Sequence, residues 1–169
     1  MSDLTPVGTR YPAGPPTYSF GAAQSSPAAT PTDLVTLYGS ATKTVKVKRV
    51  TVSGLSTTAG SMDVQLIKRT AANTAGTSAA QTPAKLDSQF ATATATLKLY
   101  SANASALGAG IVIEARQLNF GVAGAVVWDF PAGQELILRG TAQGLAINLN
   151  GGAVPTGGKV SWSVEWAEI

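Results

Sequence analysis

Residues 160–166 read Val-Ser-Trp-Ser-Val-Glu-Trp, a stretch in which every second side chain is apolar. Successive side chains of a β-strand point to opposite faces of a sheet, so this alternation predicts a strand with one face in a hydrophobic core. The apolar members are Val160, Trp162, Val164 and Trp166. We take this segment as the reference strand for the fold of the whole chain.

Similar strand signals recur upstream, separated by residues that favour turns. They predict strands over residues 34–39, 44–55, 61–69, 91–100, 111–120, 125–130, 135–140 and 145–150. No segment between them shows the helical period that a crossover connection would require. The turns can be formed by the 18 glycines and nine prolines. The predicted fold class is therefore all-β, an antiparallel β-sandwich with the jelly roll as the favoured architecture.

Two segments carry more detailed predictions. Val45 and Val47 stand at odd positions and Val50 and Val52 at even ones. In a regular strand the two pairs would point to opposite faces of the sheet, so we predict a β-bulge near Lys48–Arg49 that places all four on one face. Residues 70–86 are small and polar without any period, which predicts an exposed loop. Residues 91–100 begin with alternating Ala and Thr, and we expect a strand there, with a helical turn before it near 87–90.

The first 32 residues hold six of the nine prolines, which remove backbone donors and fix φ. We divide the chain into an extended N-terminal arm, residues 1–32, and a sandwich domain, residues 33–169. One short strand over residues 17–22 is allowed within the arm, and a disordered tail is the alternative. Tyr11, Tyr18 and Phe20 are large side chains that a solvated tail does not need, so they are candidate contacts with a partner.

The chain carries few charges, since 12% of its residues are charged and its net charge is +3. One cationic cluster contains Lys46 and Lys48 among valines, as expected of a half-exposed strand. The alternative is contact with an acidic partner, which makes these two lysines candidate binding residues. Because no aromatic side chains interleave with them, we expect no nucleic-acid partner.

The sequence contains neither histidine nor cysteine, which removes the commonest general base, the commonest metal ligand and all thiol chemistry. None of the nine carboxylates follows a calcium-loop spacing, and no glycine-rich phosphate loop precedes a helical pattern. Asp129 and Glu135 could form a glycosidase-like pair, but they flank an ordinary turn. We therefore expect no enzyme, no cofactor and no metal site.

The three tryptophans are in phase with aliphatic residues, which predicts core positions rather than a sugar-stacking platform. The alternative is ligand binding by an exposed tryptophan, for which Trp166, nearest the end of the chain, is the first candidate. Arg116 and Arg139 are interpreted as solvated or ion-paired residues, with a contact between subunits as the alternative.

The first residues lack the basic and apolar regions of a secretory signal, and no apolar run approaches the ~20 residues of a membrane helix. We expect synthesis in a reducing cytoplasm and no membrane partner.

The segments IEARQLNFG (113–121), WDFPAGQELILRGTAQGLAINLNG (128–151) and VSWSVEWAE (160–168) resemble capsid decoration, or cement, proteins of tailed bacteriophages with jelly-roll bodies. The resemblance implies a homotrimer on the outer capsid surface of a virion, made in the host cytoplasm. It implies the major capsid protein or another virion protein as the partner, with extended termini bridging capsid subunits. The alternative is a receptor- or carbohydrate-binding module of a phage tail or fibre, which exposed tryptophans would favour.

Overall fold

The computed structural model describes residues 14–121 and 124–169, which form two six-stranded sheets. The first sheet contains β1 (Thr17–Ser25), β3 (Val45–Leu55), β6 (Ala84–Lys85), β9 (Ala125–Asp129), β10 (Leu136–Leu138) and β12 (Lys159–Glu168). The second sheet contains β2 (Asp33–Tyr38), β4 (Gly60–Arg69), β5 (Ser78–Gln81), β7 (Thr96–Tyr100), β8 (Gly110–Phe120) and β11 (Gly144–Asn148).

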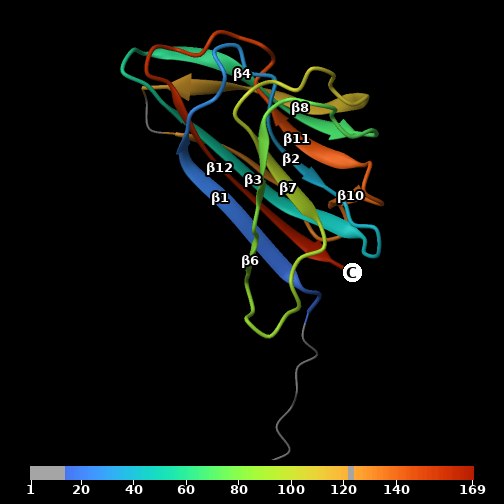
Figure 1. Ribbon diagram of the computed structural model, residues 1–169. Coiled ribbons are helices and arrows are strands. Elements are labelled where there is room, and N and C mark those ends of the chain that lie inside the picture. Colours follow the sequence, from blue (N-terminus) through green and yellow to red (C-terminus); the bar gives the residue numbers. More distant parts are fainter. Residues whose placement is uncertain (1–13, 122–123) are drawn as a thin grey trace, which may run out of the picture.

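The first sheet has the order β10-β3-β12-β1-β6, and β9 also pairs with β3 (Figure 1). The second sheet has the order β5-β7-β2-β11-β4-β8. Every pairing between these strands is antiparallel. The predicted antiparallel β-sandwich is confirmed, while the narrower assignment to the jelly roll stays a prediction.

The core lies between the two sheets, and β12 supplies its largest side chains. Trp128, Trp162 and Trp166 are all buried, with exposed fractions of 3%, 3% and 0%. The core positions predicted for the tryptophans are therefore confirmed. Trp166, the first candidate for an exception, is buried as well, because β1 and β3 flank β12 and Tyr18 packs against the Trp166 ring.

The β-bulge predicted in β3 is confirmed. Glu165 of β12 pairs with Arg49, but the next residue, Trp166, pairs with Val47, so Lys48 is the extra residue. Val47 and Val50 consequently both face the core, whereas the intervening Lys48 and Arg49 are exposed. The bulge thus keeps the apolar side chains of both halves of β3 on the same face.

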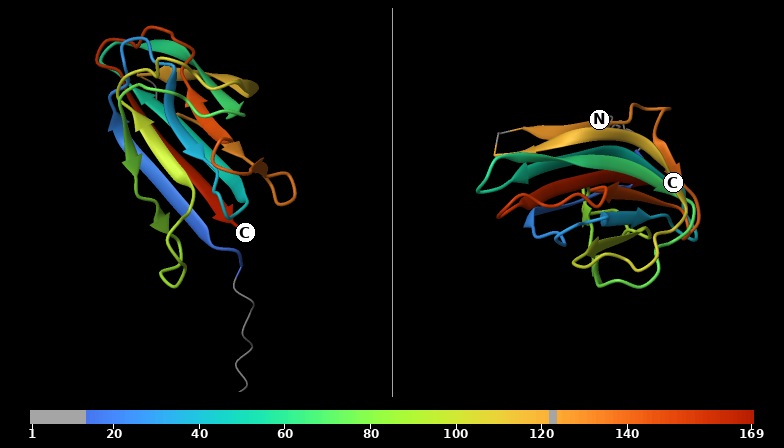
Figure 2. Two further views of the ribbon diagram at one scale, coloured as in Figure 1. Left: turned by 45° about the vertical axis from the view of Figure 1, so that its right-hand side comes forward. Right: turned by 90° about the horizontal axis from the view of Figure 1, so that it is seen from above.

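Part of the segment that we expected to be an arm belongs to the sandwich. Residues 17–25 form β1, longer than the short strand allowed there, and β1 pairs with both β12 and β6. The backbone carbonyls of Ala29, Pro31 and Thr32 accept hydrogen bonds from residues 149–154. In Figure 2 the C-terminus lies at the same end of the sandwich as the start of β1, as the hydrogen bond from the Glu168 N–H to the Pro16 carbonyl requires.

Two predicted boundaries need correction. Residues 70–86 are not one loop, because β5 pairs with β7 and β6 pairs with β1. Residues 91–95 are not strand, and β7 starts only at Thr96. The residues near 87–90 form a turn, closed by the hydrogen bond from the Phe90 N–H to the Asp87 carbonyl, rather than a helical turn.

Candidate interaction surface

The best-satisfied polar cluster of the molecule is structural. The Arg69 guanidinium donates to both carboxylate oxygens of Asp33, with Nε–Oδ2 at 3.1 Å and Nη2–Oδ1 at 2.6 Å. The side-chain amides of Asn73 and Asn148 donate to the same two oxygens at 2.7 and 2.6 Å. A third guanidinium nitrogen binds the Gly108 carbonyl at 2.8 Å. These bonds fasten the loops that follow β4 and β7 to the second sheet, which gives the cluster a structural role.

A second buried carboxylate has the same kind of role. Glu168, 2% exposed, accepts hydrogen bonds from the backbone N–H groups of Thr94 and Ala95, from the Thr94 hydroxyl at 2.6 Å and from the Trp166 indole at 3.2 Å. Since charge-assisted bonds are stronger than neutral ones, Glu168 holds the end of β12 against the segment before β7.

The outer edge of the second sheet differs from these two structural clusters, because it exposes apolar side chains to solvent. β8 ends that sheet and hydrogen-bonds to β4 alone among the described strands. Its residues 110–117 are exposed or half-buried, and three consecutive apolar residues have large exposed fractions: Ile111 72%, Val112 47% and Ile113 41%. We call residues 110–114 the β8 edge.

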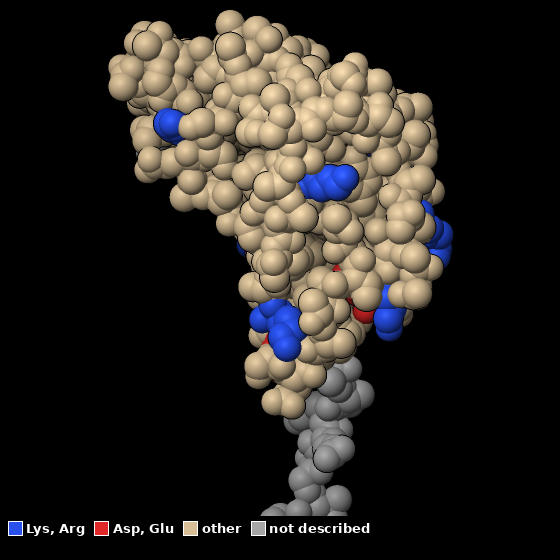
Figure 3. Space-filling view, in the orientation of Figure 1, with Lys and Arg blue, Asp and Glu red and all other residues tan. Residues whose placement is uncertain are grey.

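Charge shields the β8 edge only weakly, with Lys68 of β4 opposite Ile111. Glu114 and Arg116 pair with each other, with the carboxylate oxygen Oε1 2.6 Å from Nη2, so their charges largely cancel. The Arg116 guanidinium also lies over the Trp128 ring, 5.6 Å from its centroid. Arg116 and Trp128 thus contact each other where β8 passes β9. On the face of the molecule that Figure 3 presents, charged side chains are few and scattered, and acidic groups are scarce.

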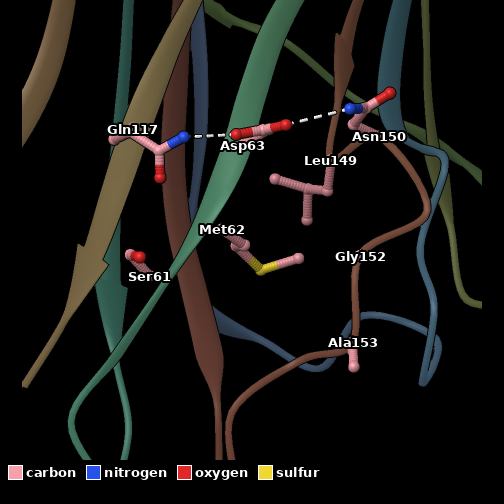
Figure 4. Close-up of a pocket in the computed structure, with 8 residues that line it drawn as sticks. All are labelled: Ser61, Met62, Asp63, Gln117, Leu149, Asn150, Gly152 and Ala153. Atoms are coloured by element: carbon pink, nitrogen blue, oxygen red, sulfur yellow. Dashed lines mark hydrogen bonds between the residues drawn. The ribbon is translucent and has the colours of Figure 1, made fainter.

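A shallow cavity of about 280 Å³ lies farther along the same strands. In Figure 4, Asp63 stands between Gln117 and Asn150, whose side-chain amides both donate to its carboxylate, while Met62 and Leu149 contribute apolar surface. Because each carboxylate oxygen already accepts an amide hydrogen, the arrangement stabilises the rim of the cavity rather than presenting a free reactive group. No aromatic side chain lines it.

The candidate contact residues occupy different environments. Tyr18 is 2% exposed and its hydroxyl donates to the Ala91 carbonyl at 2.9 Å, so it is a core residue and not a partner contact. Phe20 is half-buried against Trp162, with ring centroids 5.6 Å apart. Lys46 is half-buried and Lys48 is exposed at the bulge, so both remain available to solvent. Tyr11 lies outside the described residues.

Asp129 and Glu135 do not form a shared site. Asp129 pairs with Arg49, its Oδ1 3.0 Å from Nε. Hydrogen bonds from backbone N–H groups, its own and that of Gly133, lower the pKa of Glu135, and Lys46 and Lys48 lower it further. Neither carboxylate lines a cavity described here. A carboxylate held ionised at the surface is a poor general acid, so the glycosidase-like interpretation has no support.

The two arginines singled out in the sequence make the contacts expected of surface residues. Arg116 is ion-paired, and Arg139 donates to the Thr44 hydroxyl at 3.0 Å. Within residues 14–121 and 124–169, no three His, Cys, Asp or Glu side chains gather as a metal site would require. Across the same residues, no helix combines the length and apolarity needed to span a bilayer.

Comparison with known proteins does not place this chain in a family. Neither a known protein family, nor a curated protein, nor a solved structure matches this chain. The β8 edge is the functional candidate that sequence reasoning missed. Its signal was present, because Ile-Val-Ile at 111–113 breaks the alternation of a strand with one polar face.

Proposed function

We propose that this protein is a structural component of a bacteriophage virion, which binds the assembled capsid from outside and stabilises it. The major capsid protein is the proposed partner. A decoration protein acts by mass action and multivalency, because many modest contacts made only with the assembled shell shift its equilibrium away from disassembly.

The observation that carries this proposal is the contrast between the interior and the β8 edge. The buried carboxylates Asp33 and Glu168 are fully engaged in fastening the fold. The β8 edge instead leaves large apolar side chains on a long strand in solvent. Exposed apolar surface of this kind marks a site of contact with another macromolecule. The resemblance of residues 113–168 to decoration proteins supports the same conclusion.

The alternative function, a receptor- or carbohydrate-binding module, depended on exposed tryptophans. Burial of all three removes the stacking surface that such a module would use. The cavity beside Asp63 offers amide groups but no aromatic platform. The buried tryptophans and the exposed apolar residues of the β8 edge therefore favour binding to another protein.

Gold-labelled antibodies against this protein, applied to purified particles of the phage that encodes it, test the proposal. We expect labels distributed over the capsid shell, and a deletion of the gene should give particles that lose their DNA at lower temperature. Labels confined to the tail tip would favour the receptor-binding alternative. Particles without any label would refute a role in the virion.

A further inference from the structure

β8 is the longest edge strand among the described residues, and its length sets it apart. It has 11 residues, whereas the edge strands β5, β6 and β10 have four, two and three, and β9 has five. Short edge strands are one way in which proteins prevent unwanted pairing. The unpaired backbone groups of β8 form a template long enough for another strand.

The residues of the β8 edge also lack most of the usual devices against pairing. The edge contains no lysine and no proline, Arg116 pairs with Glu114, and Lys68, a cation opposite Ile111, lies on β4 rather than on the edge strand. One device is present: Ile113 is the extra residue of a bulge, because Leu66 pairs with Glu114 and Ile67 pairs with Val112. A bulge that only protected an edge would not require three large apolar side chains in solvent, so the β8 edge is better explained as a surface that becomes covered.

The sequence of the β8 edge is symmetric about its centre. Residues 111–113 read Ile-Val-Ile. In a two-fold antiparallel pair of identical strands, each residue lies opposite a residue of the other copy, and their numbers have a constant sum. We propose that β8 pairs with β8 of a second copy of this chain about a two-fold axis at Val112, which joins the two second sheets into one continuous sheet. This inference rests on the strand alone: it assigns the β8 edge to a second copy of the chain, so the paired copies would contact the capsid through other surfaces.

The register about Val112 is the one that the side chains favour. In this register Ile111 lies opposite Ile113 of the second copy and Val112 lies opposite itself, so each apolar residue meets another once the bulge at Ile113 straightens on pairing. Glu114 lies opposite Gly110, which leaves room for the carboxylate. An axis at Glu114 would place two carboxylates directly opposite each other, which is destabilising.

Cysteine cross-linking tests the pairing, because the chain has no cysteine of its own. The variant Val112→Cys places one thiol opposite its copy. Directly opposed Cα atoms of antiparallel strands are about 4.5–5.5 Å apart, within the range of about 4.4–6.8 Å that disulfides span. We expect mild oxidation to convert this variant into a covalent dimer. Ile111→Cys should cross-link poorly alone but efficiently when mixed with Ile113→Cys.

Leu55→Cys is the matched control, since Leu55 is an apolar residue 53% exposed at the end of β3 in the other sheet. Cross-linking of this control as fast as Val112→Cys would mean random collision and would overturn the proposal.

Light scattering on the unmodified chain, without capsids, gives a second and independent readout. We expect twice the chain mass of 17.1 kDa, and the mass of one chain for the double variant Ile111→Lys/Ile113→Lys. Circular dichroism verifies that this variant stays folded. A monomer at every concentration, or a trimer, would overturn the two-fold pairing, while capsid binding could still succeed or fail separately.

Discussion

β12 and β8 are strands of similar length and apolar content that have opposite fates. β12 has ten residues and lies between β1 and β3, so its alternate side chains, Trp162 and Trp166 among them, are buried. β8 has 11 residues and one neighbour, and Ile111 is 72% exposed. The difference teaches that apolar content does not separate a core strand from an interaction strand. The two kinds of strand are distinguished by the number of neighbouring strands and by whether other elements cover each face.

Deleting residues 1–25 would make β12 an edge strand like β8. The deletion removes β1, including Tyr18 and its contact with Trp166, so we expect a greater loss of stability than from any single substitution below. Urea denaturation followed by tryptophan fluorescence measures the loss. Unfolding at the same urea concentration as the full chain would show that β1 contributes nothing to the sandwich.

Trp166→Ala and Ile111→Ala compare the two strands at single residues. We expect the first to lower the free energy of unfolding by about 3–5 kcal/mol, because it leaves a cavity in the core. Ile111→Ala, in a side chain mostly in solvent, should change the stability of the monomer by less than about 0.5 kcal/mol. The comparison fails if equilibrium denaturation at low protein concentration gives similar losses for both.

The two ion pairs that involve Arg69 and Arg49 extend the comparison to charges. Arg69→Ala leaves the Asp33 carboxylate buried without its cation, and we expect a loss of about 3–5 kcal/mol. Arg49→Ala breaks an ion pair in which both side chains are about half exposed or more, so its loss should be below about 1 kcal/mol. Thermal unfolding of both variants measures the difference, and equal shifts in Tm would contradict the structural role of the Arg69 cluster.

The smallest effect is expected at alkaline pH. Burial, and then the hydrogen bond with Tyr38, raise the pKa of Tyr100 above the value of about 10 that it has in the unfolded chain. The neutral form is therefore favoured by folding, and its stabilising contribution is complete below about pH 10 and decreases as the pH rises further. Denaturation at several alkaline pH values should show a steeper decline for the wild type than for Tyr100→Phe. Identical slopes would contradict a buried, neutral Tyr100.

Much of the fold could be predicted because most strands have a recognisable pattern of apolar and polar residues in their own sequence. The alternation over residues 160–166 and the phase change between Val47 and Val50 both reflect which side chains must reach the core. β5 was missed because Ser-Ala-Ala-Gln carries no contrast between faces. Residues 91–95 were misread for another reason. Ala93 and Ala95 are more buried than Thr92 and Thr94, as the alternation suggested, but the backbone N–H groups of Thr94 and Ala95 donate to Glu168 instead of to a neighbouring strand.

The polar clusters and the interaction surface were less accessible to sequence reasoning. Asp33 meets Arg69 and Asn148 only after folding, and no local pattern joins residues so far apart in the chain. Tyr18 was interpreted as a contact residue because the prolines around it indicated an arm. In the structure, β1 fills the position beside β12, which places Tyr18 over Trp166.

Amide hydrogen exchange, measured by mass spectrometry at low and high protein concentration, tests most directly whether β8 is the strand that binds. Peptides from β12 should be protected at both concentrations, because their backbone groups are already paired within one chain. In peptides covering residues 110–117, the amides that face away from β4 should exchange quickly in dilute protein and become protected as the concentration rises. Exchange of residues 110–117 that does not change with protein concentration would contradict the account.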